Sequence, residues 1–494
     1  MKIKQNKVER WDIFEIELHS EKSFINPFRD VNIDACFKTG FITKKLCGFY
    51  DGDSTWRIRF MPEETGTYYF SIISDNDEFN DLKGSFESLQ PTGSNRGPIK
   101  VTNKFHFSYA DGTPFFVMGT TVYAWTYRPA EIRKQTLESL QKHGFNKVRM
   151  LVFPKHIGSM SAIDISYEPL FYPYEGSKNN FDFYSLNPDY FKNYEERIIE
   201  LLELGIEAEV ILFHTYDDGM WGLDKLDDEQ AMFYLKYIIA RFGAFRNVWW
   251  SLANEYNILH KSKWRDWDGI GFHLMEHDPY GHPRSIHNWT FAPIYSNIDW
   301  MTHVSYQNAN TYSLMLELKR NYGKPVIDDE YEYEGNLPYN WGNSSACVTL
   351  FRHWLTAMAG GYGTHGESFA TDENKKDIFW TYGGTMIGES APRLRFLKEI
   401  IESLPYQEME PDLASGFDQD IYCIKKGIDI YLYLFKEDYP GKCVTFGPQT
   451  GSNVSYEATR YDIWNCCVKG KIELIGPGEL DITGWTAVKL IRVP

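Results

Sequence analysis

The feature that most constrains the fold of this chain is a regular alternation of predicted strands and helices between residues 98 and 405. Apolar strands such as FNKVRMLVF (145–153) alternate with amphipathic helices that end at a glycine, such as PAEIRKQTLESLQKHG (129–144). Repeated alternation predicts a parallel sheet, because consecutive parallel strands need a long crossover between them. Eight such units predict an α/β fold in which the sheet closes into a (β/α)8 TIM barrel.

The strands and helices of this barrel can be placed individually. The predicted strands lie at 115–124, 145–153, 206–214, 248–256, 284–289, 299–307, 324–335 and 362–369. The predicted helices lie at 129–144, 189–205, 229–243, 264–278, 311–323, 344–361 and 391–405, and the turn SNID (296–299) counts as a degenerate fifth helix. A doubly wound sheet is the alternative, but no GxGxxG motif follows an early strand and no Walker motif is present.

Both flanks of the barrel consist of short strands. Residues 1–97 contain alternating, aromatic-rich segments such as WDIFEIEL and GTYYFSIIS, and the turn-rich PTGSNRGP (91–98) follows them. After residue 406 strands return, among them DIYLYLFKE and WTAVKLIRV. The sequence therefore predicts an N-terminal β-sandwich (1–97), the barrel (98–405) and a C-terminal β-sandwich (406–494).

Composition bears on partners and location. The formal net charge of −17 argues against nucleic acid or an anionic membrane as a partner. No apolar run reaches the ~20 residues that span a membrane, and the N-terminus lacks the apolar segment of a signal peptide. The seven cysteines are scattered, so reduced thiols and a cytoplasmic location are expected. Aromatic residues make up 16 % of the chain, which is consistent both with stacking on sugar rings and with packing in protein cores. The sequence does not decide whether the protein forms a homo-oligomer.

The fourth predicted strand, VWWSLANEY (248–256), is apolar but ends in Asn254 and Glu255. Alternation places Glu255 on the barrel interior, with Ser251 and Ala253, and places Asn254 on the helix-facing side. Active sites of such barrels form at the C-terminal ends of the strands. We therefore expect Glu255 at the mouth of the barrel, although an isolated Asn-Glu pair is more often a surface or capping feature.

The seventh predicted strand, KPVIDDEYEYEG, supplies a second carboxylate at its end, Glu330. Alternation places Asp328 on the face of Glu330 and excludes Asp329 from that face. Asp328, Asp329, Glu332 and Glu334 compete for the same role, and we assign it to Glu330. Two carboxylates across a barrel mouth suit glycoside cleavage, in which one protonates the leaving oxygen and the other attacks the anomeric carbon or activates water.

Further polar and aromatic residues occur at or near the strand ends. Arg149 lies within an apolar strand, where a buried guanidinium needs an acidic partner such as Glu330. Asn254 is expected to bind a sugar hydroxyl. The other candidates for substrate binding are His214, His303, Tyr306, His365 and Glu367, with Trp125, Trp221, Trp289 and Trp341 as sugar platforms. Any one of these His residues alone is more often structural than functional, and each Trp is as often a core residue as a platform.

Other chemistries lack their motifs. The sequence contains no HxH, HExxH or CxxC pattern, so we predict no metal and no cofactor. It also contains no GxSxG elbow, which argues against a serine hydrolase.

These motifs resemble those of the clan A (β/α)8 glycoside hydrolases, which are retaining enzymes. LANE (252–255) and PVIDDE (325–330) match that clan's acid/base and nucleophile motifs. The chain also resembles the cellulase-like family 5 of this clan. Arg149 and His214 resemble that family's active-site Arg on strand two and His on strand three, and His303 and Tyr306 resemble its His and Tyr on strand six. The chain departs from family 5 at the eighth strand, where THGE (364–367) replaces a Trp that carries the sugar.

The whole chain resembles a narrower group of bacterial glycosidases, which have an N-terminal sandwich of unknown function, an apiosidase-like barrel and a small C-terminal sandwich. This resemblance implies a retaining glycoside hydrolase with Glu255 as acid/base and Glu330 as nucleophile, acting on plant-type glycan fragments. A non-catalytic carbohydrate-binding or scaffold protein is the alternative, as is a transglycosylase that uses the same residues. The sequence does not identify the sugar, the linkage or the mode of attack.

Overall fold

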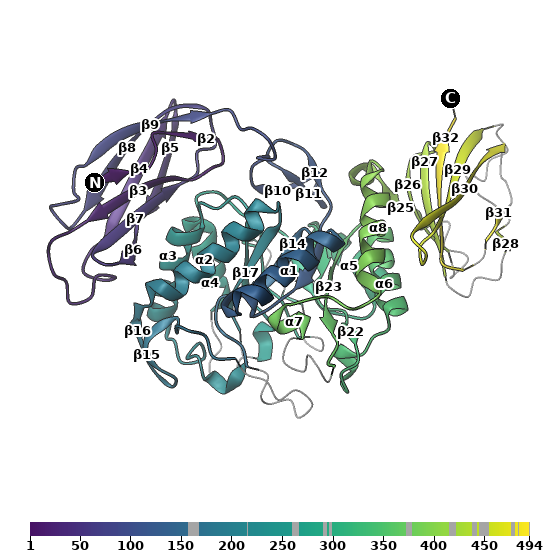
Figure 1. Cartoon of the computed structure of the whole chain (residues 1–494). Helices are drawn as coiled ribbons and strands as arrows, with labels where there is room; N and C mark the ends of the chain where they lie inside the picture. The colour runs from purple at the N-terminus through teal and green to yellow at the C-terminus, as the bar shows by residue number, and fades with distance from the viewer. Residues whose placement is uncertain are drawn as a thin grey trace.

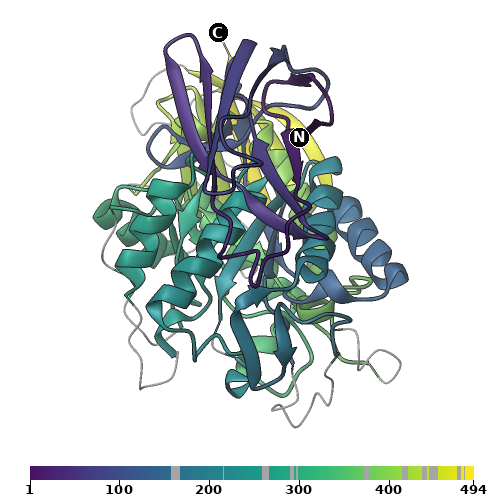
Figure 2. The same ribbon diagram turned by 90° about the vertical axis from the view of Figure 1, so that its left-hand side faces the viewer.

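The structure is a computed structural model, and it shows a barrel flanked by a sheet domain at each end (Figure 1). The N-terminal strands lie against one side of the barrel, and the C-terminal strands lie at the opposite end of the molecule (Figures 1 and 2). The structure describes residues 1–156, 167–214, 216–258, 266–289, 294–295, 299–371, 378–413, 421–436, 442–443, 454–475, 480–482 and 484–493.

The central sheet confirms the predicted barrel. Its eight strands are parallel and follow the order β19-β18-β17-β14-β13-β23-β21-β20. They are β13 (Met118–Thr121), β14 (Lys147–Leu151), β17 (Glu207–Phe213), β18 (Val248–Ala253), β19 (Arg284–Ser285), β20 (Val304–Tyr306), β21 (Val326–Asp328) and β23 (Tyr362–His365). The backbone N–H of Thr302 donates to the carbonyl of Arg284 at 2.9 Å, which brings the two ends of this sheet together.

Helices follow the strands and cover the outside of the barrel. They are α1 (Ala130–His143), α2 (Pro188–Glu203), α3 (Asp228–Phe242), α4 (Trp267–His277), α5 (Thr311–Tyr322), α6 (Ala346–Met358), α7 (Phe379–Tyr382) and α8 (Ser390–Glu402). Gly144 and Gly323 end α1 and α5 with φ of 72° and 62°, which glycine adopts without steric strain. The predicted degenerate helix SNID lies, except for its last residue, outside the described residues.

The N-terminal part is a sandwich of two sheets. One sheet contains β1 (Lys2–Ile3), β3 (Phe14–His19), β6 (Phe49–Gly52) and β7 (Thr55–Phe60), and the other contains β2 (Lys7–Glu9), β4 (Ile33–Thr39), β5 (Ile42–Cys47), β8 (Gly66–Ser74) and β9 (Lys83–Leu89). Alternate side chains of both sheets meet in one aromatic core, where Phe14 of the first sheet stacks on Phe86 of the second at 3.9 Å.

A small sheet closes the N-terminal end of the barrel. It consists of β10 (Ile99–Thr102), β11 (His106–Tyr109) and β12 (Pro114–Phe115). Phe107 of β11 packs on Trp249, near the start of β18, at 4.9 Å, and on His303, which directly precedes β20, at 5.6 Å. This end of the barrel is therefore filled by side chains, and a site must form at the other end.

The C-terminal part is built on a six-stranded antiparallel sheet. Its strands are β25 (Glu410–Pro411), β26 (Ile421–Lys426), β27 (Ile430–Phe435), β29 (Ser455–Asp462), β30 (Cys467–Ile475) and β32 (Thr486–Arg492), and β28 (Lys442–Cys443) pairs with β31 (Leu480–Asp481). The sheet packs against the barrel helices, where Arg393 of α8 lies over the ring of Trp464 at 3.7 Å. The boundaries predicted at 97/98 and 405/406 fall in connections on either side of the barrel.

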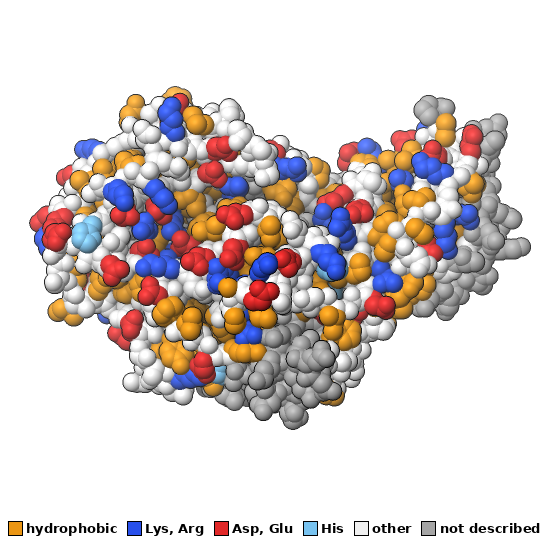
Figure 3. Space-filling model, in the orientation of Figure 1, with side chains coloured by type: hydrophobic (Ala, Val, Ile, Leu, Met, Phe, Trp, Pro, Cys, Tyr) orange, Lys and Arg blue, Asp and Glu red, His pale blue; other side chains and the backbone are white. Residues whose placement is uncertain are grey.

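The surface carries charges of both signs. Figure 3 shows Lys and Arg side chains interspersed with Asp and Glu over the N-terminal sandwich and the barrel helices. Within the described residues, none of the helices combines the length and the apolar character that crossing a bilayer requires.

Candidate active site

The carboxyl end of β18 brings Asn254 and Glu255 into the mouth of the barrel. β18 ends at Ala253, and Glu255 has a φ of 50°, in the left-handed region that residues other than glycine rarely adopt. Alternation correctly places Trp250 on the helix-facing side, where its Nε1 donates to Asp278 at 3.3 Å. The prediction for Asn254 was wrong, because the strand has already ended and its side chain also points into the mouth, toward Arg149.

Glu330 follows β21 and lies within reach of Asn254. Its Oε1 accepts hydrogen bonds from Arg149 Nη1 at 2.8 Å and from the hydroxyl of Tyr123, and Asn254 Nδ2 lies 3.3 Å away. His287 Nε2, at the end of β19, lies 3.6 Å from the same oxygen. The ion pair between Arg149 and Glu330 that the sequence predicted is present.

The alternation predicted along the seventh strand was wrong. Asp329 points into the barrel, where its Oδ1 lies 3.1 Å from Lys147 Nζ and its Oδ2 accepts from Ser305 Oγ at 2.5 Å. Asp328 points away from the barrel interior, and its Oδ1 accepts a hydrogen bond from the backbone N–H of Asn308 at 3.4 Å. The strand ends at Asp328, so period-two alternation does not reach Glu330, and Asp329 and Glu330 both contact Arg149.

Arg149 forms hydrogen bonds with residues that follow both β18 and β21, the strands that Glu255 and Glu330 follow. Its Nη1 donates to Glu330 and its Nη2 donates to Asn254 Oδ1 at 2.5 Å. Its Nε lies 3.5 Å from Glu209 and 3.7 Å from Asp329. Burial acts to lower the pKa of Arg149, but these carboxylates hold it well above its ordinary value. The guanidinium is thus a permanent positive charge that fixes both Asn254 and Glu330.

Glu255 is held by a different set of groups. Tyr216 donates its hydroxyl to Oε2 at 2.6 Å, and Gln307 Nε2 donates to Oε1 at 2.9 Å. The hydroxyl of Tyr216 also accepts from Asn254 Nδ2 at 2.6 Å. Asn254 and Tyr216 therefore connect the carboxylates of Glu255 and Glu330 through hydrogen bonds.

The two glutamates have opposite electrostatic environments. Burial and the negative charge of Glu330 raise the pKa of Glu255. Burial acts in the same direction on Glu330, but the charge of Arg149 and the hydrogen bond from Tyr123 outweigh it and lower the pKa of Glu330. One carboxyl group is therefore poised to hold a proton while the other stays ionised.

Sequence reasoning missed Tyr123, and it noted Tyr216, His287 and Gln307 as polar residues at predicted strand ends without assigning them to the site. Gln307 could have been found from the parity of β20, because Ser305 points inward and so does the residue two positions later. His287 Nδ1 forms a hydrogen bond with Ser305 Oγ at 3.0 Å. Burial lowers the pKa of His287 to about 4, so its imidazole is neutral at neutral pH. Tyr123 and Tyr216 lie in loops, where no periodicity indicates their direction.

Two further predicted residues lie beside the glutamates. His214 stacks on Tyr216 with ring centroids 5.3 Å apart, and burial lowers its pKa to about 3. Trp289 is 39 % exposed and follows Asn288, whose carbonyl accepts from Gln307 Nε2 at 3.0 Å. A half-exposed indole at the rim of the mouth suits a sugar platform.

Four of the predicted binding residues lie elsewhere. His303 precedes β20 and packs on Trp249 and Phe107 at the closed end of the barrel. Tyr306 points outward and belongs to the apolar cluster beneath α5, because it has the opposite parity to Gln307. His365 stacks on Phe145 at 5.1 Å, and Glu367 accepts the backbone N–H groups of Ile387 and Gly388 at 2.7 and 2.9 Å. The structure does not bring these four residues to the two glutamates.

The three other predicted tryptophan platforms differ in their surroundings. Trp125, in η1 (Trp125–Tyr127), is buried in the main core, and Trp221 is buried with its Nε1 donating to Asp217 at 2.7 Å. Trp341, in η4 (Asn340–Gly342), packs on Trp380 at 5.0 Å. Trp380 of α7 lies 5.8 Å from Tyr123, so the loop after β23 provides a Trp near Glu330 although the strand itself does not.

The described residues contain no group of three or more His, Cys, Asp or Glu side chains arranged to hold a metal ion. The titratable groups of the mouth are instead paired with one another, as Arg149 is with Glu330. The chemistry that these residues can perform is proton transfer and nucleophilic attack by carboxylates.

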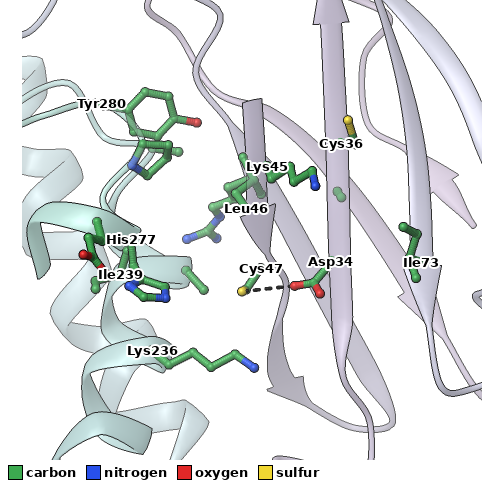
Figure 4. Close-up of a pocket in the computed structure, with 16 residues that line it drawn as sticks. Asp34, Cys36, Lys45, Leu46, Cys47, Ile73, Lys236, Ile239, His277 and Tyr280 are labelled. Carbon is green, nitrogen blue, oxygen red and sulfur yellow. Dashed lines mark hydrogen bonds between the residues drawn. The ribbon is translucent and has the colours of Figure 1, made fainter. Parts of the chain in front are cut away.

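A separate cavity of about 400 Å³ lies between the N-terminal sandwich and the barrel helices (Figure 4). Its lining includes Asp34 and Cys47 from the sandwich and Lys236 and His277 from α3 and α4. Cys47 donates to Asp34 at 3.2 Å, and burial raises the pKa of this thiol to about 11. None of the residues around Glu255 and Glu330 lines this cavity.

Comparison with protein families assigns the barrel. Residues 101–408 match the family described as "Apiosidase-like, catalytic domain". The chain belongs to this family. It therefore carries a glycosidase-type catalytic domain, as the sequence resemblance implied. Residues 7–75 match a domain of unknown function, DUF5060, which covers most of the strands of the N-terminal sandwich.

Solved structures agree with this assignment. A candidate glycoside hydrolase from Bacteroides vulgatus ATCC 8482 is 35 % identical, with a TM-score of 0.89, and the match covers 99 % of this chain and 100 % of that one. A glycoside hydrolase family 5 protein from the same organism shares the fold at 15 % identity and a TM-score of 0.60, over 80 % of this chain and 94 % of that one. No curated protein matches the chain.

Proposed function

We propose that the protein is a retaining glycosidase that hydrolyses O-glycosidic bonds of plant-type oligosaccharides, with Glu330 as nucleophile and Glu255 as acid/base. The observation that carries the proposal is the opposite environment of the two carboxyl groups: the pKa of Glu255 is raised and that of Glu330 is lowered. A pair of carboxyl groups whose pKa values are separated in this way is the pattern of an acid and a nucleophile.

In the first step the ionised Glu330 attacks the anomeric carbon while Glu255 donates its proton to the leaving oxygen. A glycosyl ester forms on Glu330, and the bond to the leaving group breaks. In the second step Glu255, now ionised, takes a proton from water, and the resulting hydroxide equivalent releases the sugar from Glu330. Net retention of anomeric configuration follows from two inversions.

The supporting groups have distinct roles in this scheme. Arg149 keeps Glu330 ionised, and it also fixes Asn254, whose amide lies at 3.3 Å from the nucleophile and is placed to meet a sugar hydroxyl. Tyr216 and Gln307 orient the two oxygens of Glu255. Trp289 at the rim and the aromatic wall around Trp380 are surfaces against which sugar rings can pack.

The experiment that tests this proposal combines two variants with the stereochemistry of the product. Glu330→Gln should abolish turnover of plant-derived oligosaccharides, and Glu255→Gln should reduce it by about 10²–10⁴-fold, with both proteins still folded by circular dichroism. NMR spectra recorded early in the reaction should show a product of retained configuration. An inverted product, or full activity in Glu330→Gln, would remove Glu330 from the nucleophile's role.

A matched control separates this loss from a structural effect. Glu332→Gln alters a nearby carboxylate that pairs with Arg352 at 2.8 Å, away from Glu255 and Arg149. It should retain most of the activity. Products in which a sugar replaces water as acceptor would identify the enzyme as a transglycosylase with the same two residues.

A further inference from the structure

The imidazole of His287 lies between the two glutamates of the mouth. Its Nε2 lies 3.6 Å from Glu330 Oε1 and 3.3 Å from Gln307 Nε2, and that amide donates to Glu255 Oε1 at 2.9 Å. The side chain of His287 is completely buried. A protonated Nε2 would donate toward Glu330, whereas an unprotonated Nε2 accepts from Gln307, so the position of the ring proton decides which glutamate His287 serves.

A buried carboxylate fixes the proton on the other ring nitrogen. Burial acts to raise the pKa of Asp329, but Lys147, whose Nζ lies 3.1 Å away, and Arg149 hold it well below its ordinary value. An ionised carboxylate can only accept, so Ser305 Oγ donates its single proton to Asp329 Oδ2 at 2.5 Å. Ser305 Oγ must then accept from His287 Nδ1, which lies 3.0 Å away, and Nδ1 therefore carries a proton.

The ring carries only this one proton at neutral pH. Burial and the charge of Arg149 lower the pKa of His287 to about 4, against the opposing effect of the carboxylates around it. Its Nε2 is then unprotonated and accepts from Gln307. The carbonyl of Asn288, which can only accept, lies 3.0 Å from the same Gln307 nitrogen and so fixes the orientation of that amide.

The backbone of His287 also holds the chain on both sides of the acid/base. Its N–H donates to the carbonyl of Ala253 at 3.0 Å, and its carbonyl accepts from the N–H of Tyr256 at 3.0 Å. These two bonds bracket Glu255, whose φ of 50° is a strained conformation. A substitution of the side chain retains both backbone bonds, so the contribution of the imidazole can be tested by itself.

We propose that His287 is a positioning residue that holds Gln307 on the acid/base Glu255 by accepting through its unprotonated Nε2. Ser305 and Asp329 set this tautomer. The inference rests on the proposed function, and it names the side chains that orient its acid/base. Loss of the acceptor should release the Gln307 amide and misdirect the proton that Glu255 gives to the leaving oxygen, while the nucleophile keeps its own partners.

Two substitutions of His287 separate the two ends of the imidazole. His287→Gln places an amide oxygen near the position of Nε2, where it can still accept from Gln307. His287→Asn keeps a donor near the position of Nδ1, toward Ser305, and loses the acceptor. The substrates are the phenyl and 2,4-dinitrophenyl glycosides of the common plant monosaccharide that the wild type cleaves fastest. Dinitrophenolate leaves without a proton, whereas phenolate needs the general acid.

His287→Asn should lower kcat/KM for the phenyl glycoside by about 10- to 100-fold, because a misplaced acid delivers its proton poorly. Its kcat/KM for the dinitrophenyl glycoside should stay close to the wild-type value, and His287→Gln should retain most of the activity on both substrates. Melting temperatures verify that both variants are folded. Equal losses on the two substrates in His287→Asn, or equal losses in the two variants, overturn the inference.

A double variant shows whether the imidazole acts through Gln307. Gln307→Met removes the amide and should reproduce the substrate pattern of His287→Asn. The combined variant should then lose no more activity on the phenyl glycoside than Gln307→Met alone, because two residues that act as one unit are not additive. Losses that multiply in the combined variant contradict the proposal.

The tautomer can be observed without any substrate. In protein labelled with nitrogen-15 histidine, the ring resonances that disappear in His287→Gln identify His287. Their shifts should show a proton on Nδ1 and none on Nε2 at pH 7. In Ser305→Ala, Nδ1 loses its acceptor, and part of the population should carry the proton on Nε2, facing Glu330. A wild-type ring protonated on Nε2 overturns the inference.

The two proposals fail in different ways. If Glu330→Gln retains activity, the assignment of the nucleophile fails, and the nitrogen-15 spectra still decide the tautomer of His287. If Glu330→Gln is inactive but His287→Asn affects both aryl glycosides equally, the glycosidase stands and the role of His287 falls.

Discussion

At the scale of single residues, the chemistry depends on which of the two glutamates carries a proton. The proposed mechanism requires Glu330 ionised and Glu255 protonated. The lowered pKa of Glu330 keeps it ionised below the ordinary value of 4.5, and the raised pKa of Glu255 keeps it protonated above that value. We therefore expect a bell-shaped pH profile of kcat/KM, with the acid limb from Glu330 and the basic limb from Glu255. In Glu255→Gln, measured with an activated aryl glycoside, the basic limb should disappear; its persistence would assign it to another group.

The hydroxyls of Tyr123 and Tyr216 provide a matched pair of tests. Each donates to one glutamate and lowers its pKa, Tyr123 to Glu330 and Tyr216 to Glu255. Tyr123→Phe should move the acid limb of the kcat/KM profile to higher pH, whereas Tyr216→Phe should move the basic limb to higher pH. Each lost hydrogen bond corresponds to about 0.5–1.5 kcal/mol. If the two variants move the same limb, the assignment of acid and nucleophile is wrong.

At this scale, sequence reasoning identified residues at the strand ends better than it predicted where their side chains point. Glu255, Glu330 and Arg149 follow from polar groups at or near the ends of apolar strands. The direction of Asn254 and Asp329 did not, because alternation stops where the strand stops, and Glu255 adopts a φ of 50° that no pattern announces. Residues such as Tyr123 and Tyr216 are placed by loops, whose conformation depends on distant contacts such as the hydrogen bond from the Tyr123 backbone N–H to the Trp380 carbonyl at 3.0 Å.

At the scale of elements, two carboxylates that sequence reasoning placed among the site candidates instead anchor the start of α8. Glu334 accepts the backbone N–H of Glu389 at 2.8 Å and of Ser390 at 3.1 Å, together with the Ser390 hydroxyl. Glu367 accepts hydrogen bonds from the backbone N–H groups of the two preceding residues, Ile387 and Gly388. Negative charge at a helix N-terminus is favourable, because the first N–H groups have no intrahelical partner.

Glu334→Gln should therefore lower stability without removing a catalytic group. Burial acts to raise the pKa of Glu334, but hydrogen bonds from His365 and Ser390 lower it below the ordinary 4.5. A lowered folded-state pKa stabilises the protein above the unfolded value, and this contribution is lost as the pH falls through the folded value. The variant should lose about 1–3 kcal/mol of unfolding free energy at pH 7 in urea titrations, and less at acidic pH.

A substitution on the exposed side of the same helix controls for charge alone. Glu399 pairs with Arg395 at 3.0 Å, and both side chains are more than half exposed. Glu399→Gln should change the unfolding free energy by no more than about 0.5 kcal/mol. Equal effects of the two substitutions would contradict the capping role of Glu334.

Most of the elements were predictable, because barrel strands such as β18 are largely apolar and helices such as α2 are amphipathic over several turns. One element that escaped prediction is α7, a single turn of sequence FWTY that has neither period nor a side-chain cap. This turn carries Trp380 to the mouth of the barrel, where its ring centroid lies 5.8 Å from that of Tyr123.

At the scale of the whole molecule, the N-terminal sandwich is joined to the barrel by buried ion pairs. Arg241 of α3 contacts Asp51 of β6 at 2.8 Å and Glu195 of α2 at 2.9 Å. Arg59 of β7 contacts the same Glu195 at 2.7 Å and Glu15 of β3 at 2.8 Å. Separating the sandwich from the barrel would break these ion pairs and leave their charges without partners. Sequence reasoning did not find the network because its residues are far apart in the sequence.

This network predicts that the sandwich and the barrel unfold together. In Arg241→Met, Asp51 and Glu195 lose a buried partner, and removing one member of a buried pair costs about 3–5 kcal/mol. We expect one calorimetric transition in the wild type, and a lower, split transition in the variant as the sandwich separates first. Lys134→Met, which removes an exposed partner of Glu138, should leave the single transition in place. A single unshifted transition in Arg241→Met would mean that apolar contacts at the interface, not these charges, hold the two parts together.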